Sequence, residues 1–242
     1  LLADADVVIA IGTELAWTDS FVERLPITGD VVRVDVDETR FDDRYPATVG
    51  VEGDAAQACD AMLRVLGHGP SNRGGGQARV QEASLANTAR RTELEVKHGH
   101  VLSAVRNALP DNAIVSVDST QITYTGQFDF PVDSPRQWMY GAGFCTLGGA
   151  LPEGIGAALA CPDSPVMVIA GDGGFMFSMP ELATAVELGL SLPILVWNND
   201  GLAQIKDGMV SRGFNPTGVT TRNPDFGALA AVDDVSLEFR HG

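Results

Sequence analysis

Gly171-Asp172-Gly173-Gly174-Phe175 opens the stretch that decides the fold, and Leu195-Val196-Trp197-Asn198-Asn199-Asp200-Gly201 closes it. Residues 166–170 come just before the first segment and form the short apolar run that is typical of a buried parallel strand. Residues 194–197 predict the neighbouring strand, and residues 179–190 predict a helix between them, because their apolar side chains recur at helical spacing. Ligands bind at the carboxyl ends of such strands, so both segments are expected at a ligand-binding edge.

Asp172 and Asn199 are separated by about the length of one strand-helix-strand crossover, so both are expected at the same edge. A carboxylate and an amide oxygen suit Mg²⁺, which prefers oxygen ligands and shares its shell with phosphates. Gly173 and Gly174 lack a Cβ, so backbone N–H groups at a helix start can approach phosphate oxygens. The alternative is two ordinary turns. The pairing of both motifs at this spacing favours a site for a metal ion and a diphosphate.

A second polar loop, Asp118-Ser119-Thr120-Gln121, follows residues 113–117, which predict another strand. Its hydroxyl and amide groups suit a diphosphate at the same edge. The alternative is a plain Asx or Ser/Thr turn.

The order of predicted elements indicates an α/β protein with two Rossmann-like parallel-sheet domains, the first of them incomplete. Residues 1–67 predict the second half of one such domain. Residues 68–77, which are rich in glycine, predict a linker. Residues 78–242 predict the second domain, and the ending after Ala231 does not continue its pattern.

Residues 78–109 predict helical structure that is interrupted near Gly99. His98 and His100 flank this glycine, and a spacing of two residues does not place them on one helical face. Metal binding by this pair is therefore not expected, and surface positions are predicted for both.

Composition excludes several classes of protein. The formal net charge of −16 argues against a nucleic-acid partner, which requires a basic face. No apolar segment is long enough to cross a membrane, and no signal peptide is recognisable. The three cysteines, Cys59, Cys145 and Cys161, are widely spaced and predict a reducing cytoplasm without disulfides or a zinc site.

The Gly171-Asp172-Gly173 and Asn198-Asn199 pair resembles the signature of thiamine diphosphate (ThDP) enzymes, in the branch of acetolactate synthases and 2-oxo acid decarboxylases. Gly143-Phe144-Cys145-Thr146-Leu147-Gly148-Gly149-Ala150-Leu151-Pro152 resembles the family segment beneath the cofactor rings. The resemblance extends to about Ala231. It implies that residues 1–67 belong to the central domain and that the second domain binds the diphosphate.

The resemblance also implies roles for single residues. Asp172 and Asn199 would bind Mg²⁺ through their side chains, and Gly201 through its carbonyl. Leu147 would fold the cofactor into a V shape, with its N–H and the Cys145 carbonyl facing the pyrimidine. The residues expected to contact the cofactor are Thr120, Gln121, Cys145, Leu147, Gly171, Asp172, Gly173, Gly174, Asn199 and Gly201.

The resemblance further implies decarboxylation of a 2-oxo acid at the thiazolium ring. The family glutamate that contacts the pyrimidine belongs to an amino-terminal domain of a partner subunit, so no catalytic residue is expected within this chain, and these residues by themselves are expected to be inactive. A homodimer or homotetramer is implied because the cofactor lies between subunits. The side chains expected to touch substrate are those of Gln204, Ile205 and Met209.

The pattern around Gly12, Asp118 and Asn198 resembles most the acetolactate-synthase-like decarboxylases of larger 2-oxo acids, including the guanidino-oxopentanoate type. Acetolactate synthase is the alternative. Flavin (FAD) binding is doubtful, because Glu14 stands where the flavin-carrying relatives have an arginine. Two other classes stay open: a non-catalytic nucleotide-binding module, and an NAD-dependent dehydrogenase, for which the full glycine fingerprint is absent.

Overall fold

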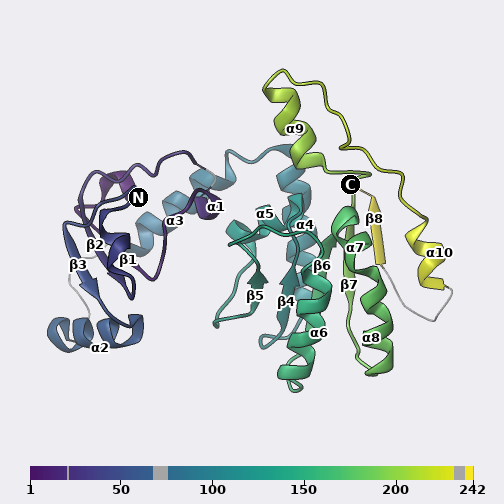
Figure 1. Ribbon diagram of the computed structural model, residues 1–242, viewed down its shortest axis with the longest axis horizontal. Helices are drawn as coiled ribbons and strands as arrows, with labels where there is room; N and C mark the ends of the chain where they lie inside the picture. Colours follow the sequence, from purple (N-terminus) through teal and green to yellow (C-terminus); the bar gives the residue numbers. More distant parts are fainter. Residues whose placement is uncertain (21, 68–75, 232–237, 242) are drawn as a thin grey trace. The chain divides into compact units, whose positions relative to one another are not determined.

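The computed structural model describes residues 1–20, 22–67, 76–231 and 238–241 (Figure 1). The described residues divide into two units, Leu1–Arg90 and Arg91–Gly242. The predicted linker at residues 68–77 lies outside the described residues, apart from Gly76 and Gln77, which begin a helix. None of the described helices is long and apolar enough to cross a membrane.

The first unit contains a parallel sheet with the strand order β1-β2-β3. In order, the elements are η1 (Leu2–Asp4), β1 (Val7–Ile11), α1 (Trp17–Ser20), β2 (Asp30–Asp35), η2 (Glu38–Asp42), β3 (Val49–Glu52), α2 (Ala55–Leu66) and α3 (Gly76–Thr88).

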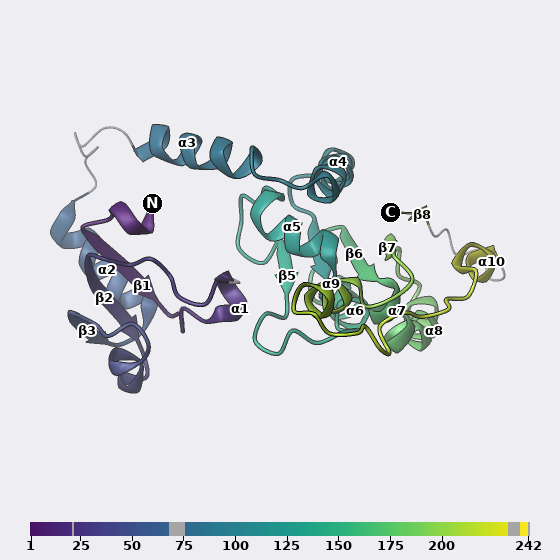
Figure 2. The same cartoon turned by 90° about the horizontal axis from the view of Figure 1, so that it is seen from above.

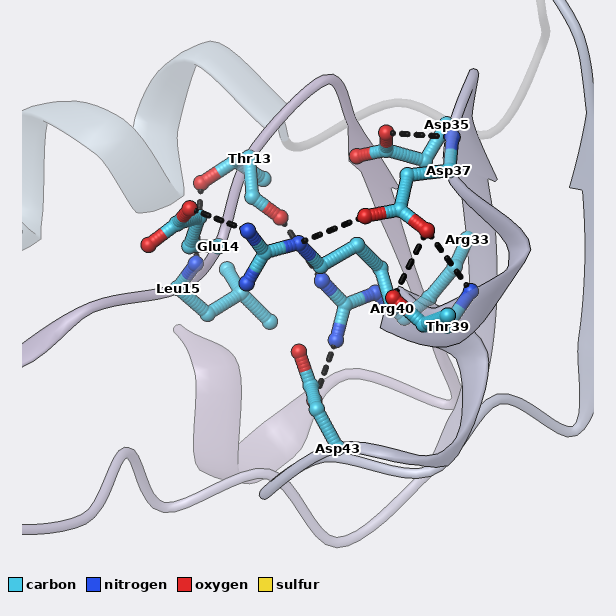
Figure 3. Close-up of polar contacts among 9 residues, drawn as sticks. All are labelled: Thr13, Glu14, Leu15, Arg33, Asp35, Asp37, Thr39, Arg40 and Asp43. Atoms are coloured by element: carbon cyan, nitrogen blue, oxygen red, sulfur yellow. Dashed lines mark hydrogen bonds and ion pairs between the residues drawn. The ribbon is translucent and has the colours of Figure 1, made fainter.

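Arg33 is a buried arginine that hydrogen-bonds to loop residues of the first unit (Figure 3). Arg33, in the middle of β2, is 1% exposed. Its guanidinium donates hydrogen bonds to Asp43 Oδ1 at 2.6 Å and to the Thr13 carbonyl at 2.7 Å. It also reaches the Tyr45 carbonyl at 3.4 Å. A buried charge is tolerated only when it is paired and hydrogen-bonded, and these three acceptors meet that requirement.

The second unit contains a parallel sheet with the strand order β5-β4-β6-β7-β8. The fold-class prediction of two parallel sheets is therefore confirmed. The strands are β4 (Ile114–Val117), β5 (Trp138–Tyr140), β6 (Val166–Gly171), β7 (Ile194–Asn198) and β8 (Glu238–His241). The helices are α4 (Glu93–Ala108), α5 (Gln121–Asp129), α6 (Ala150–Ala160), α7 (Asp172–Ser178), η3 (Met179–Glu181), α8 (Leu182–Glu187), α9 (Ala203–Ser211) and α10 (Phe226–Ala231).

Helices cover both faces of this sheet (Figure 2). Val168 and Ala170 of β6 pack with residues of α6, α7 and α8, whereas Ile169 packs with residues of α4 and α5. Successive side chains of a strand point to opposite faces, so a strand covered on both faces is apolar along its length. This is why the run at residues 166–170 predicted a buried strand correctly.

The boundaries of two predicted helical segments differ from the structure. The helical segment is interrupted between α3 and α4, not near Gly99, because Thr92 and Glu95 form a capping box that starts α4. The helix expected at residues 179–190 already begins at Asp172 as α7 and continues through η3 into α8. The atypical ending contributes β8, which pairs in parallel with β7.

His98 was predicted at the surface but is 1% exposed. It shares one face of α4 with the buried residues Leu102 and Val105. Its Nδ1 lies 2.8 Å from Thr125 Oγ1, and its ring meets Trp197 edge-on at a centroid distance of 4.8 Å. Burial lowers the pKa of His98 to about 4, so the ring is neutral at physiological pH.

Candidate cofactor site

The carboxyl ends of β4, β6 and β7 bring the three polar segments to one edge of the sheet. Val117 pairs with Ile169, and Gly171 pairs with Trp197. The loop that begins at Asp118 therefore lies beside the Gly171-Asp172 turn, which in turn lies beside Asn198-Asn199. The strands predicted from the sequence are neighbours, as expected for one ligand-binding edge.

Asp172 is the first residue of α7 and is 2% exposed. Its Oδ2 accepts hydrogen bonds from the Gly201 N–H at 3.0 Å and from Asn223 Nδ2 at 2.6 Å. The carboxylate of Asp172 is thus held directly against the loop that contains Asn199 and Gly201. No cluster of three or more His, Cys, Asp and Glu side chains suited to a metal ion occurs within the described part of the chain.

Asn199 supplies a buried oxygen that is not hydrogen-bonded. Its Nδ2 donates to Gln121 Oε1 at 3.2 Å, whereas its buried Oδ1 has no hydrogen-bond partner among the described residues. A buried polar atom without a partner costs about 1–3 kcal/mol, so the Asn199 Oδ1 is available to bind a water molecule or a ligand. An amide oxygen is a common ligand of Mg²⁺, and Asn199 therefore fits a cation at this edge.

Gly201 occupies a position that admits no side chain. It forms a bridge with Thr220, and a Cβ at Gly201 would lie 2.2 Å from the Val219 carbonyl oxygen. The Leu202 N–H donates to the same carbonyl at 2.9 Å. The backbone contact at Val219 and Thr220 fixes the path of the loop after Asn199.

Asp118 is a buried residue of this edge to which the sequence analysis gave no role. It is 2% exposed, and both of its side-chain oxygens accept from the Gly148 N–H, at 3.0 and 2.9 Å. Burial raises the pKa of Asp118, and backbone N–H groups of Gly148, Ser119 and Gly149 act in the opposite direction. Its place directly after a predicted strand was the signal that could have identified it.

Because Gly174 has no side chain, the Asp118 carboxylate can occupy the space next to it. A Cβ at Gly174 would lie 1.8 Å from Asp118 Oδ2, whereas a Cβ at Gly173 would meet Leu202 Cδ2 at an ordinary 3.5 Å. Gly174 is therefore required by packing between α7 and the Asp118 carboxylate.

This difference between the two glycines gives a matched test. We expect Gly174→Ala to destabilise the protein by about 2 kcal/mol, because the added methyl group displaces a buried, hydrogen-bonded carboxylate. Gly173→Ala should remain within about 0.5 kcal/mol of the wild type. Calorimetric unfolding of the full-length variants measures both. Equal melting temperatures would contradict the steric argument.

Gln121 joins Asn199 to the helix α9. Besides accepting from Asn199, it donates from Nε2 to Gln204 Oε1 at 3.5 Å and to Asp207 Oδ2 at 3.3 Å. Thr120, the residue before α5, is buried, and a Cβ at Gly171 would lie 2.9 Å from its Oγ1. Both polar residues that were expected to contact phosphate thus lie at the edge.

The segment that contains Cys145 and Leu147 connects β5 to α6. Cys145 has a φ of 47°, in the left-handed region, and its Sγ donates to the Ala142 carbonyl at 3.1 Å. Leu147 is half-buried next to Gly148, which Asp118 holds. The roles expected for Cys145 and Leu147 toward cofactor rings stay predictions.

The residues expected to contact substrate lie on α9. Gln204 and Ile205 are exposed and Met209 is half-buried. Of these three, Gln204 is brought to the edge by its contact with Gln121. The roles of all three stay predictions.

Glu14, the residue that made flavin binding doubtful, lies in the first unit close to Arg40 (Figure 3). Arg40 Nη2 pairs with Glu14 Oε1 at 2.6 Å, and Arg40 Nε lies 3.6 Å from Asp37 Oδ2. Hydrogen bonds from Thr39 lower the pKa of Asp37. The Glu14 carboxylate is therefore engaged by an arginine of its own chain.

One edge of this parallel sheet brings together the buried Asp172 carboxylate, the unpaired Asn199 Oδ1 and the start of α7. This arrangement is typical of ligand-binding α/β domains. Residues 118–240 match the family model described as "Thiamine pyrophosphate enzyme, C-terminal TPP binding domain". Residues 1–62 match the model described as "Thiamine pyrophosphate enzyme, central domain". The chain belongs to the thiamine pyrophosphate enzyme family, and ThDP is the cofactor that this family's carboxy-terminal domain binds.

Curated relatives carry the names of two kinds of enzyme. The chain is 44% identical over 230 residues to "Probable 2-ketoarginine decarboxylase AruI" of Pseudomonas aeruginosa, covering 95% of this chain and 41% of the relative. It is 26% identical over 250 residues to "Acetolactate synthase isozyme 3 large subunit" of Escherichia coli, covering 98% and 43%. It is 38% identical over 110 residues to "Acetolactate synthase isozyme 1 large subunit" of the same organism, covering 46% and 20%. The chain spans less than half the length of these relatives.

Proposed function

We propose that the full-length protein is a ThDP- and Mg²⁺-dependent decarboxylase of a 2-oxo acid. The observation that carries this proposal is the unpaired, buried Asn199 Oδ1. It belongs to the loop whose Gly201 N–H is hydrogen-bonded to the Asp172 carboxylate. Asp172, Asn199 and the Gly201 carbonyl hold the metal ion. When bound, the cofactor would supply a nucleophilic carbon for addition to the substrate, and its cationic thiazolium ring would take up the electron pair released as CO₂ leaves.

The protein's own residues bind and orient the cofactor. Thr120, Gln121 and the backbone at Gly173 and Gly174 face the diphosphate, where the start of a helix favours negative charge. Leu147 would support the folded arrangement of the two rings, and its N–H and the Cys145 carbonyl would face the pyrimidine. Holding the pyrimidine amino group near the reacting carbon is a proximity effect, which can supply a large part of the rate.

The substrate is a larger 2-oxo acid, and Gln204, Ile205 and Met209 of α9 touch it. The 44% identity to a relative named as a 2-ketoarginine decarboxylase supports a substrate with a guanidinium group. The exposed carboxylate of Asp207, near Gln121, is compatible with such a cation. Acetolactate synthase remains the second candidate, because relatives with that name also cover most of the chain.

A homodimer or homotetramer is part of the proposal. Phe144, in the segment expected beneath the cofactor rings, is 97% exposed, and Phe177 of α7 is 72% exposed. Phe144 is close to Gly148 in the sequence. Phe177 is close to it in space, since a Cβ at Gly148 would lie 3.0 Å from Phe177 Cβ. Apolar side chains gathered at a ligand site suit a subunit interface.

A cytoplasmic location is supported by the free cysteines Cys59, Cys145 and Cys161.

The test is a substrate screen with the full-length protein, ThDP and Mg²⁺. Calorimetry first measures ThDP binding with and without Mg²⁺. CO₂ release and carbon–carbon bond formation are then scored separately for pyruvate, unbranched 2-oxo acids and 5-guanidino-2-oxopentanoate. We expect CO₂ release without a ligation product, fastest with the guanidino acid. Acetolactate formation from pyruvate would favour the second candidate, and an absence of Mg²⁺-dependent ThDP binding would contradict both.

A further inference from the structure

Asn223 is a polar residue at the candidate site that neither the motifs nor the proposed function uses. It lies between α9 and α10, three residues before Phe226, which is buried in the core. The Phe226 ring meets Phe175 of α7 at a centroid distance of 5.8 Å. Asp225 Oδ1 accepts from the Ala228 N–H at 3.0 Å and so fixes the start of α10. The backbone at Asn223 is therefore anchored next to the helix that begins at Asp172.

The side-chain amide of Asn223 is surrounded by oxygens from two segments. Its Nδ2 lies 2.6 Å from Asp172 Oδ2, 2.8 Å from Asn198 Oδ1 and 3.4 Å from Asp200 Oδ1. Its own Oδ1 accepts from Thr221 Oγ1 at 3.1 Å, which sets the orientation of the amide. One NH₂ group thus connects the start of α7 to the loop after β7.

These two segments carry all of the proposed metal ligands. Asp172 begins α7. Asn199 lies between Asn198, the last residue of β7, and Asp200, both of which Asn223 contacts. A donor on a ligating carboxylate holds it in one orientation, and loss of such a partner typically weakens metal binding 10- to 100-fold. The partial positive charge of the Asn223 NH₂ group lies between the carboxylates of Asp172 and Asp200 and so offsets their repulsion.

We propose that Asn223 is a positioning residue for Asp172 and the loop after β7, and that it sets the affinity of this site for a divalent cation. This inference rests on the proposed function, because it assumes the metal ion at Asp172 and Asn199. It assigns no contact with substrate to Asn223. The residue acts only through the orientation of the ligands.

The test compares full-length wild type, Asn223→Ala and Asn215→Ala, with Mn²⁺ as the probe. Asn215 is an exposed asparagine in the same connection between α9 and α10, so its variant is the matched control. Electron paramagnetic resonance measures free Mn²⁺ in the presence of ThDP. We expect Asn223→Ala to weaken Mn²⁺ binding 10- to 100-fold and Asn215→Ala to leave it within twofold. At saturating Mn²⁺, the ThDP affinity of Asn223→Ala should return to the wild-type value.

If Asn223 only positions the ligands, the ThDP affinity of Asn223→Ala recovers at saturating Mn²⁺. If Asn223 has a general structural role, its loss lowers the ThDP affinity at every Mn²⁺ concentration. If Asn223→Ala fails to fold, Asn223→Ser replaces it in the test. This variant keeps one O–H donor and should bind Mn²⁺ more weakly than the wild type, by less than 100-fold. Wild-type Mn²⁺ affinity in the Asn223 variants would overturn this inference alone. A wild-type protein that does not bind ThDP with Mn²⁺ or Mg²⁺ would instead overturn the proposed function.

Discussion

Asp172→Ala is expected to abolish Mg²⁺-dependent retention of ThDP by the full-length protein. The substitution removes the only carboxylate among the proposed metal ligands, and it also removes the acceptor of the Gly201 N–H and of Asn223 Nδ2. The metal ion then lacks its charged ligand, and the loop that holds Asn199 loses its attachment to α7. Gel filtration followed by assay of bound ThDP measures retention, and calorimetry measures the Mg²⁺ dependence.

Asp163→Ala is the matched control for this prediction. Asp163 is an exposed aspartate in the turn before β6, at the end of the strand opposite to Asp172. Its loss changes the net charge by the same amount and should leave ThDP retention unchanged. Wild-type retention of ThDP by Asp172→Ala would remove the metal site from this edge of the sheet.

Arg33→Ala is expected to destabilise the first unit by about 3 kcal/mol, because removal of one partner leaves the other groups of a buried ion pair without compensation. Asp43 loses its ion-pair partner, and the Thr13 and Tyr45 carbonyls lose their donor. The Asp43 side chain is 23% exposed and can regain some hydration, which places the cost at the lower end of the usual range. Calorimetry of the full-length protein measures the effect as a shift of the unfolding transition to lower temperature.

Arg40→Ala removes the same charge from the same unit at an exposed site. Arg40 pairs with Glu14 and Asp37, but its side chain is 37% exposed, and such ion pairs contribute at most about 1 kcal/mol. We expect its loss to be within that limit. Similar destabilisation by the two variants would show that burial of Arg33 is not the source of its effect.

Local pattern was sufficient for much of the fold and for the family. Residues 166–170 and 194–197 are apolar without interruption, which is typical of strands covered on both faces, and the structure confirms both as neighbours in a parallel sheet. Parallel neighbours end at the same edge, so their positions alone placed Asp172 beside the loop that contains Asn199. The ThDP family followed from the same two motifs and is confirmed by the family models.

Periodicity did not predict the surroundings of polar side chains. His98 occupies a buried face of α4, but a histidine amid charged neighbours gave no sign that Thr125 and Trp197 would cover it. The break before α4 depends on the capping box of Thr92 and Glu95, which apolar periodicity does not report. In both cases the deciding contact was a specific hydrogen bond, and hydrophobic spacing carries no information about such contacts.

The sequence by itself determined the α/β class, the parallel strands and the edge at which a metal ion and a diphosphate are expected, because strand composition and chain order control these features. The tertiary structure alone decided which side chains complete that edge. Asn223 reaches Asp172 across 51 positions of sequence, and Asp118 reaches Gly148 across 30. Such contacts depend on the paths of connecting loops and on the space left by residues such as Gly174. They are set by packing of the whole domain, which no local pattern encodes.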